Sequence, residues 1–186
     1  MSPGSLVVRI DDHQITIDVV AGASHVVPVG PRTLVDGPLE HADPMPPANL
    51  TNALGLVADH LDDLVIEAPS IAAAPSITIT GSHAEVLACV EIGTDTCPTR
   101  HELARDDADE VFRTLALETV DDRLHNPGLP YDHVETVIGT CCVVLGIMRR
   151  FDLTGVVVLA GDDDTVDPDD TTGPGDTGDP SGGDPR

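Results

Sequence analysis

Residues 6–20, which read LVVRIDDHQITIDVV, decide the fold together with residues 23–29, which read ASHVVPV. Ile15, Ile17 and Val19 alternate with polar residues, and this period of two is typical of a strand with one buried face. The pattern predicts strands over residues 6–10, 14–20 and 23–29. Because the connections between them are short, we expect two antiparallel hairpins.

The middle of the chain predicts an irregular stretch, a helix, a strand and a second helix. Pro and Gly interrupt regular structure over residues 28–47, and Pro46-Pro47 suits the start of a helix. Apolar residues then recur every three or four positions on one helical face: Leu50, Leu54, Val57, Leu61 and Leu64. Residues 76–80 predict a short strand, and residues 83–92 predict a helix.

The second half of the chain is expected to be mostly helical. Asp107 and Glu110 have the spacing of a capping box. The apolar stripe behind them consists of Ala108, Val111, Phe112 and Leu115. A short helix from Thr119 ends at residues 126–128. A longer one over residues 132–150 is apolar nearly all round, and residues 155–160 predict a wholly apolar strand inside a covered sheet.

The resulting order, β-β-β-α-β-α-α-α-β, predicts an α/β domain. Its mixed sheet has three antiparallel N-terminal strands, and helices pack on it. We expect residues 1–162 to form this one domain. Residues 163–186 consist almost entirely of Asp, Gly, Pro, Thr and Ser, and they predict a disordered acidic tail.

The charge of the chain excludes several classes of protein. Its 33 acidic residues face 9 basic ones, all Arg, for a net charge of -24. Such a chain repels nucleic acid and anionic membranes. The longest uncharged apolar run, residues 136–148, is too short to cross a bilayer, and the N-terminus lacks a signal-peptide pattern. Four Cys without framework spacing suit a reducing compartment, so we expect a cytoplasmic protein.

Three groups of side chains could have a chemical function, and each also has a purely structural explanation. Asp11-Asp12-His13 has the groups to bind a divalent ion, and Asp is also common in tight turns. Cys141-Cys142 is either a redox pair or two small side chains packed in a helix.

A zinc site is the third possibility. The candidate ligands are His83, Cys89, Cys97 and His101. Only Cys97 and His101 have a usable spacing, and the alternative is four unrelated side chains on a helix and a loop. The acidic tail lacks the spacing of an EF-hand calcium loop.

A series of short motifs runs in order from about residue 5 to residue 162. They are residues 27–34 (VPVGPRTL), 39–47 (LEHADPMPP), 77–82 (ITITGS), 119–123 (TVDDR), 127–129 (PGL) and 139–142 (GTCC). Each motif alone is short. Together they resemble a segment of the exopolyphosphatase and guanosine pentaphosphate phosphohydrolase (Ppx/GppA) family.

The resemblance implies an actin-like ATPase (ribonuclease-H-like) fold, and only the second of the two lobes that family members have. In the family, glycine-rich turns from both lobes hold phosphate in the cleft, and Mg2+ assists hydrolysis. The general-base Glu belongs to the first lobe and has no counterpart in this chain. The positions that correspond to phosphate-binding turns are Asp11, Asp12, His13, Gly30, Arg32, Gly81 and Ser82.

The first of these turns departs from the family pattern. Where the family has Asp-Ile-Gly-Gly-Gly-Ser, residues 9–14 read RIDDHQ. Glycines let backbone N–H groups close on a phosphate, whereas a carboxylate ~4 Å from a phosphate charge costs about 1–4 kcal/mol. The phosphate-binding set is therefore expected to be vestigial. We expect no catalytic residue, and Asp11 and Asp12 are the only candidate metal ligands in it.

These observations favour a degenerate, non-catalytic binding or regulatory module without a cofactor, which docks on a protein partner that supplies a complementary lobe. The alternative is an exopolyphosphatase or guanosine pentaphosphate phosphohydrolase. It would use Mg2+ to cleave phosphoanhydride bonds and would need a separate first lobe. A third possibility is an acidic α/β domain unrelated to the family.

Overall fold

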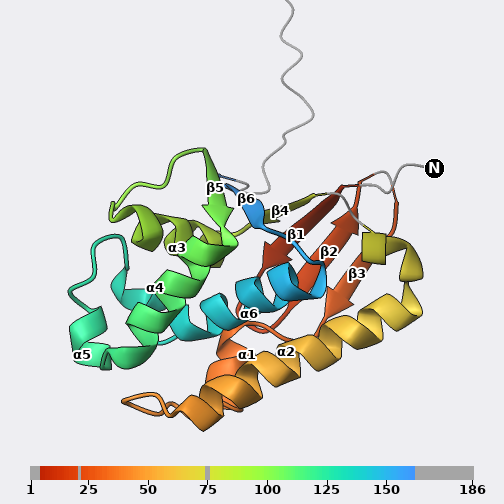
Figure 1. The fold of residues 1–186 in the computed structure, drawn as a ribbon. Helices are drawn as coiled ribbons and strands as arrows, with labels where there is room; N and C mark the ends of the chain where they lie inside the picture. The colour runs from red at the N-terminus through yellow and green to blue at the C-terminus, as the bar shows by residue number, and fades with distance from the viewer. Residues whose placement is uncertain (1–4, 21, 74–75, 162–186) are drawn as a thin grey trace, which may run out of the picture.

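A computed structural model describes residues 5–20, 22–73 and 76–161, and they form one mixed six-stranded sheet with helices packed on it. The first three strands, β1 (Leu6–Ile10), β2 (Ile15–Val19) and β3 (Ser24–Val27), form the two predicted antiparallel hairpins. They are shown in red in Figure 1. The predicted tail, residues 163–186, lies outside the described residues.

The rest of the sheet grows from β1. β4 (Ile77–Thr80) is parallel to β1, and β6 (Gly155–Leu159) is parallel to β4. β5 (Arg100–Ala104) pairs antiparallel with β6 at the edge, so the strand order is β3-β2-β1-β4-β6-β5. The sequence did not predict β5. Its residues, RHELA, show no apolar alternation, and Leu103 is the one residue of this strand that is buried.

Six α-helices lie within the described residues. They are α1 (Pro31–Asp36), α2 (Pro47–Glu67), α3 (Ser82–Ile92), α4 (Arg105–Leu117), α5 (Val120–Arg123) and α6 (Val137–Arg150). Two 3-10 helices, Pro69–Ala73 and Tyr131–His133, complete the structure. α6 lies at the centre, in contact with α1, α2, α3 and α4, and its residues 137–148 are all buried.

Three helix predictions were wrong in part. α1 lies inside the stretch expected to be irregular, where Pro31 occupies the first helical turn. α4 begins at Arg105 without a side-chain cap, whereas the capping box is at Thr119 and Asp122, where it begins α5. The long final helix begins at Val137 rather than at residue 132, after a separate 3-10 turn.

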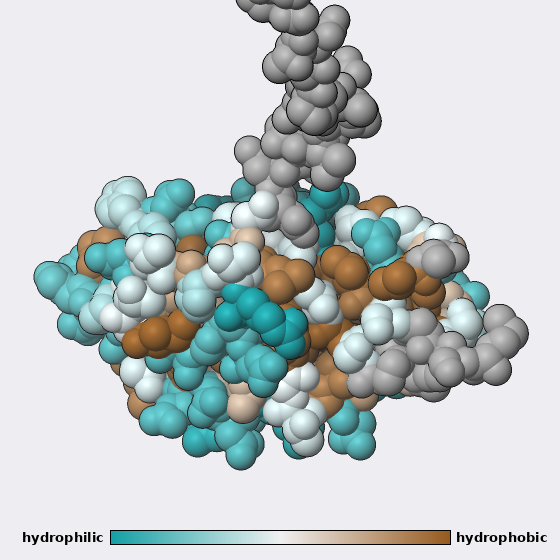
Figure 2. Space-filling view, turned by 90° about the horizontal axis from the view of Figure 1, so that it is seen from above, coloured by the Kyte–Doolittle hydropathy of each residue, from teal (hydrophilic) through white to brown (hydrophobic). Residues whose placement is uncertain are grey.

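The core lies between the sheet and the helices. Leu6, Val8 and Ile10 of β1 are at most 1% exposed, while Val7 and Arg9 point to the opposite face. Hydrophobic residues are not confined to the interior, since Figure 2 shows brown residues on the surface of the molecule. No helix within residues 5–20, 22–73 and 76–161 is long and apolar enough to cross a membrane.

Candidate functional site

A hollow of about 590 Å³ opens where β1 and β4 end. Its lining residues are Ile10, Asp11, Asp12, Arg32, Gly81, Ser82, His83, Asp132 and His133. In open sheets, the carboxyl ends of parallel strands are where ligands usually bind. The hollow therefore brings together five of the seven predicted phosphate-binding residues: Asp11, Asp12, Arg32, Gly81 and Ser82.

The turn between β1 and β2 is docked on the start of α1 through its backbone. The Asp11 amide donates to the Gln14 carbonyl (3.0 Å), and the Arg32 amide donates to the Asp12 carbonyl (2.8 Å). The Thr33 hydroxyl donates to the His13 carbonyl (3.0 Å), and His13 does not line the hollow. The carbonyl oxygens of Asp12 and His13 thus anchor the turn to α1.

Gly30 is the residue that permits this close approach. A Cβ at position 30 would lie 2.5 Å from the carbonyl oxygens of both Asp11 and Asp12, far inside van der Waals contact. Gly30 is buried, so it supports the turn from behind and contributes no atom to the lining of the hollow.

His83 fixes the carboxylate of Asp12. Its Nε2 lies 2.9 Å from Asp12 Oδ1, and its Nδ1 lies 3.2 Å from the Thr140 hydroxyl of α6. The His83 side chain is 5% exposed and that of Asp12 is 60% exposed. Burial lowers the pKa of His83 from its usual value, while the hydrogen bond to Asp12 opposes this shift. In the neutral ring, Nε2–H donates to Asp12. The Thr140 hydroxyl lies 3.2 Å from both Nδ1 and the Thr136 carbonyl, so its single hydrogen serves only one of these two acceptors at a time.

His133 completes the floor of the hollow. Its ring meets that of His83 edge to face, with the ring centres 4.8 Å apart. Asp132 and His133 come from the 3-10 helix Tyr131–His133. The sequence did not predict that these two residues belong to the site, because it placed Asp132 at the start of a long helix. Pro130, just before this segment, was the signal that could have indicated a separate turn.

The charges that line the hollow are mostly negative. Asp11, Asp12 and Asp132 contribute carboxylates, and Arg32 is the one Arg among the lining residues. The Arg32 guanidinium already donates to Glu135 Oε2 at 2.9 Å. A ligand with several negative charges therefore meets net repulsion at this surface.

The start of α3 is the one part of the hollow that resembles an anion cradle. Gly81 has φ 98°, a left-handed conformation that favours glycine, and no side chain caps the helix. A Cβ at position 81 would also lie 2.9 Å from the Ile10 carbonyl. Amides in the first turn of a helix have no partner within the helix, and they attract negative charge.

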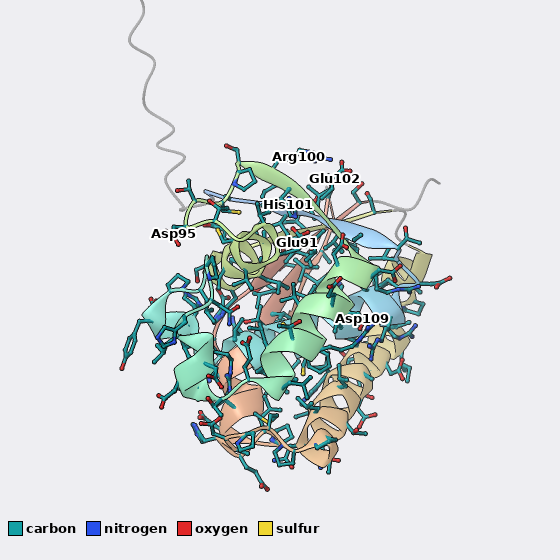
Figure 3. The ribbon with its side chains drawn as sticks, turned by 60° about the vertical axis from the view of Figure 1, so that its left-hand side comes forward. Glu91, Asp95, Arg100, His101, Glu102 and Asp109 are labelled. Atoms are coloured by element: carbon teal, nitrogen blue, oxygen red, sulfur yellow. The ribbon has the colours of Figure 1, made fainter. Side chains whose placement is uncertain are left out.

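The predicted zinc ligands do not come together. His83 contacts Asp12, and His101 of β5 lies 2.8 Å from Glu91 of α3. Figure 3 shows His101 and Glu91 next to one another. Cys89 and Cys97 line a separate pocket, and burial raises the pKa of Cys97 to about 11. Within the described part of the chain, no three His, Cys, Asp or Glu residues are arranged to hold a metal ion, Asp11 and Asp12 included.

Cys141 and Cys142 are packed inside α6. Both are at most 1% exposed, and burial raises the pKa of Cys142 to about 12 and that of Cys141 further still. Thiols that stay protonated at neutral pH react slowly. The structure therefore favours the packing interpretation over a redox pair.

Solved structures share this fold. An exopolyphosphatase-like protein matches with a TM-score of 0.75 and 16% identity, over 86% of this chain and 56% of its own. The Ppx/GppA enzyme of Aquifex aeolicus matches with a TM-score of 0.74 and 12% identity, over 86% of this chain and 54% of its own. An exopolyphosphatase from Cytophaga hutchinsonii matches with a TM-score of 0.71 and 15% identity, over 86% of this chain and 54% of its own.

The chain has the Ppx/GppA fold. It spans only about half the length of these solved structures. The predicted α/β class, with three antiparallel N-terminal strands and helices packed on a mixed sheet, is confirmed. Comparison of the sequence with models of protein families finds no match, and comparison with curated proteins finds none either.

Proposed function

We propose that this chain is a non-catalytic binding or regulatory module built on one lobe of the Ppx/GppA fold. The observation that carries the proposal is the turn over residues 11–14. Its Asp12 carboxylate is held at the hollow by His83, and the side chains of Asp11 and Asp12 both line the hollow. A site for polyphosphate needs amides and cations at this place, and these two carboxylates supply the opposite charge.

The partner of such a module is a chain that supplies a complementary lobe. Support comes from length alone, since the solved structures of this fold are nearly twice as long as the part that this chain matches. The hollow would then lie at the contact between the two lobes, as ligand sites often do between domains. Because the basic residues of this chain are few, the partner would have to provide most of the positive charge.

Hydrolysis of polyphosphate or guanosine pentaphosphate is the second candidate. Two features favour it, the uncapped start of α3 and the Arg32 side chain, which both line the hollow. Mg2+ is usually held by one or two carboxylates together with substrate phosphates. Asp11 and Asp12 could contribute in that way, although no metal site made of protein side chains alone occurs in the described ranges.

The test is release of inorganic phosphate from long-chain polyphosphate by the purified chain with Mg2+. We expect no release above the background of a buffer blank. Release by the wild-type chain that disappears in the Asp11→Ala, Asp12→Ala double variant would refute the proposal and support the hydrolase. An Asp59→Ala variant, altered at an exposed position of α2, is the control for an unspecific effect of charge. The assay should be repeated with guanosine pentaphosphate.

A further inference from the structure

Two cysteines outside the hollow lie against one another. Cys89 belongs to the last turn of α3, and Cys97 follows in the loop that leads to β5. Both line one pocket of about 410 Å³, a hydrogen bond joins their thiols, and both thiols are free. A disulfide requires that the two side chains point toward one another. Thiols that share a hydrogen bond meet this requirement.

The backbone at the end of α3 brings Cys97 back to Cys89. Gly93 has φ 74°, a left-handed conformation that favours glycine and that often ends a helix. The amides of Gly93 (2.9 Å) and Thr94 (3.0 Å) both donate to the Cys89 carbonyl. Cys97 then packs against the core, although it belongs to a loop. The approach of the two cysteines thus follows from the cap of the helix.

The other two cysteines have no such arrangement. Cys141 and Cys142 are adjacent in α6, and neighbours in a helix point about 100° apart, so they cannot join to one another. Both are buried, whereas Cys97 is partly exposed. Of the four cysteines, Cys89 and Cys97 are therefore the pair that a small oxidant can reach and that can form a bond.

The cysteine pair is also connected to the hollow. Asp95 lies between the two cysteines in the sequence, and its Oδ1 accepts from the Gly128 amide at 3.3 Å. Gly128 packs so closely on the Cys89 carbonyl that a Cβ at position 128 would collide with it. Residues 128–130 lead directly into the 3-10 helix that carries Asp132 and His133 to the hollow. The loop between the cysteines thus supports the segment that forms the floor of the hollow.

We propose that Cys89 and Cys97 form a reversible disulfide when the protein meets hydrogen peroxide, and that this bond holds Asp95 against Gly128. The bond closes the loop after α3 and restricts the segment that precedes the 3-10 helix Tyr131–His133. The pair lies outside the hollow, so this proposal goes beyond the proposed function and does not depend on it.

The reaction needs one two-electron oxidant. Cys89 loses its proton, and its thiolate attacks one oxygen of the peroxide; the O–O bond breaks, a sulfenic acid forms, and the leaving hydroxide takes up the proton as water. The Cys97 sulfur then attacks the sulfenic sulfur, and the hydroxyl group leaves with the Cys97 proton as a second water. Two thiols are thus oxidised to one disulfide while one peroxide is reduced to two waters. A dithiol reductant reverses the oxidation and becomes a disulfide itself.

The surroundings of the thiols set the rate of this reaction. Burial raises the pKa of both, that of Cys97 to about 11, so little thiolate is present at neutral pH and oxidation is slow. The hydrogen bond from Cys97 opposes this shift at Cys89 and favours Cys89 as the first thiol to react. The second step is intramolecular, so the closeness of the two sulfur atoms favours the disulfide over other products. We therefore expect a response to sustained oxidation.

The test starts from the full chain with all four thiols reduced. After incubation with a small excess of hydrogen peroxide, two of the four thiols should no longer react with an alkylating reagent in the unfolded protein. Glu91 lies between the two cysteines, so a protease that cleaves after Glu should release two peptides joined by a disulfide, which dithiothreitol separates. The thermal midpoint of the oxidised chain should be higher by about 5 °C. Hydrogen exchange should become slower at Gly128 and stay unchanged in α2.

Variants assign the bond to this pair. Cys97→Ser should keep its remaining thiols free under the same treatment and show no rise of the midpoint. Thr96→Ser, one position away, is the matched control and should form the linked peptides as the wild type does. Four free thiols after treatment, a bond that includes Cys141 or Cys142, a bond between two chains, or sulfinic acid without a linked peptide would each overturn the proposal. Linked peptides without slower exchange at Gly128 would overturn the connection to the hollow.

Discussion

A single buried imidazole connects four parts of the molecule. His83 of α3 contacts Asp12 after β1, Thr140 of α6 and the ring of His133. Its neutral form places no charge in the core, where an unpaired ion is costly. One residue of the hollow that is itself almost inaccessible thus links the turn after β1, α6 and the 3-10 helix Tyr131–His133.

The burial of His83 predicts how stability changes with pH. Burial lowers the pKa of His83 in the folded state below that of the unfolded chain, 6.5. At a pH between these values the unfolded chain holds more protons, so the stabilising contribution of His83 is complete above 6.5 and is lost as the pH falls toward the folded pKa. In urea unfolding, the wild type should lose more stability between pH 7.5 and 5.5 than the His83→Gln variant.

The control for this experiment is His60→Gln, which alters a partly exposed histidine on α2. Its pH dependence should match that of the wild type. If His83→Gln and the wild type lose the same stability over this pH range, the described environment of His83 is wrong.

At the scale of elements, α1 and α6 lie in close contact. Gly139 of α6 lies against the backbone of Pro31, and a Cβ at position 139 would be 2.5 Å from the Pro31 carbonyl oxygen. Arg32, the next residue of α1, lines the hollow. The spacing of the two helices thus helps to set where the guanidinium lies.

Two glycine substitutions should therefore have opposite effects. Gly139→Ala should destabilise the fold by about 1–3 kcal/mol, because α1 must move away from α6. Gly55→Ala, in α2 where nothing lies within 4 Å of the added atom, should stabilise it by roughly 0.5–1 kcal/mol. The measurement is the urea midpoint of each variant. A gain in stability for Gly139→Ala equal to that for Gly55→Ala would contradict the close contact.

Elements with a regular apolar period were predictable from the sequence, and those built by long-range contacts were not. β2 and α2 each bury one face, so the spacing of Ile15 and Ile17, or of Val57 and Leu61, predicts them. β5 has no such period, because its order comes from pairing with β6. α1 is only six residues long and lies among prolines, so local pattern gave no signal for it.

The candidate site was predictable only in part. Asp11, Asp12, Arg32, Gly81 and Ser82 could be grouped because the family resemblance placed them in corresponding turns, and they line one hollow. His133 and Thr140 could not, since no sequence spacing relates them to His83. Whether these residues bind phosphate stays a prediction.

At the scale of the whole molecule, net charge is the dominant feature. A chain with 33 acidic and 9 basic residues repels itself in the compact state. Salt shortens the range of this repulsion from about 30 Å at 0.01 M to about 3 Å at 1 M. Raising NaCl from 0.02 to 0.5 M should therefore raise the midpoint of thermal unfolding by roughly 2–4 °C, as a gain of about 1 kcal/mol would.

Sucrose, which carries no charge, is the comparison for this measurement. It should raise the midpoint with a similar slope at both salt concentrations, because it acts by exclusion from the surface. A midpoint that does not change with NaCl would contradict this prediction, because it would show that repulsion between the acidic residues does not destabilise the folded state.

The position of Tyr131 has a practical consequence. The chain has no Trp and only this one Tyr, which is 84% exposed and stands next to Asp132 and His133 in the lining of the hollow. Near-ultraviolet absorption and fluorescence of the protein thus arise almost entirely from one phenol, which belongs to the same 3-10 helix as two lining residues. A ligand that moves this 3-10 helix should change the tyrosine emission, so its binding could be followed without attaching a dye.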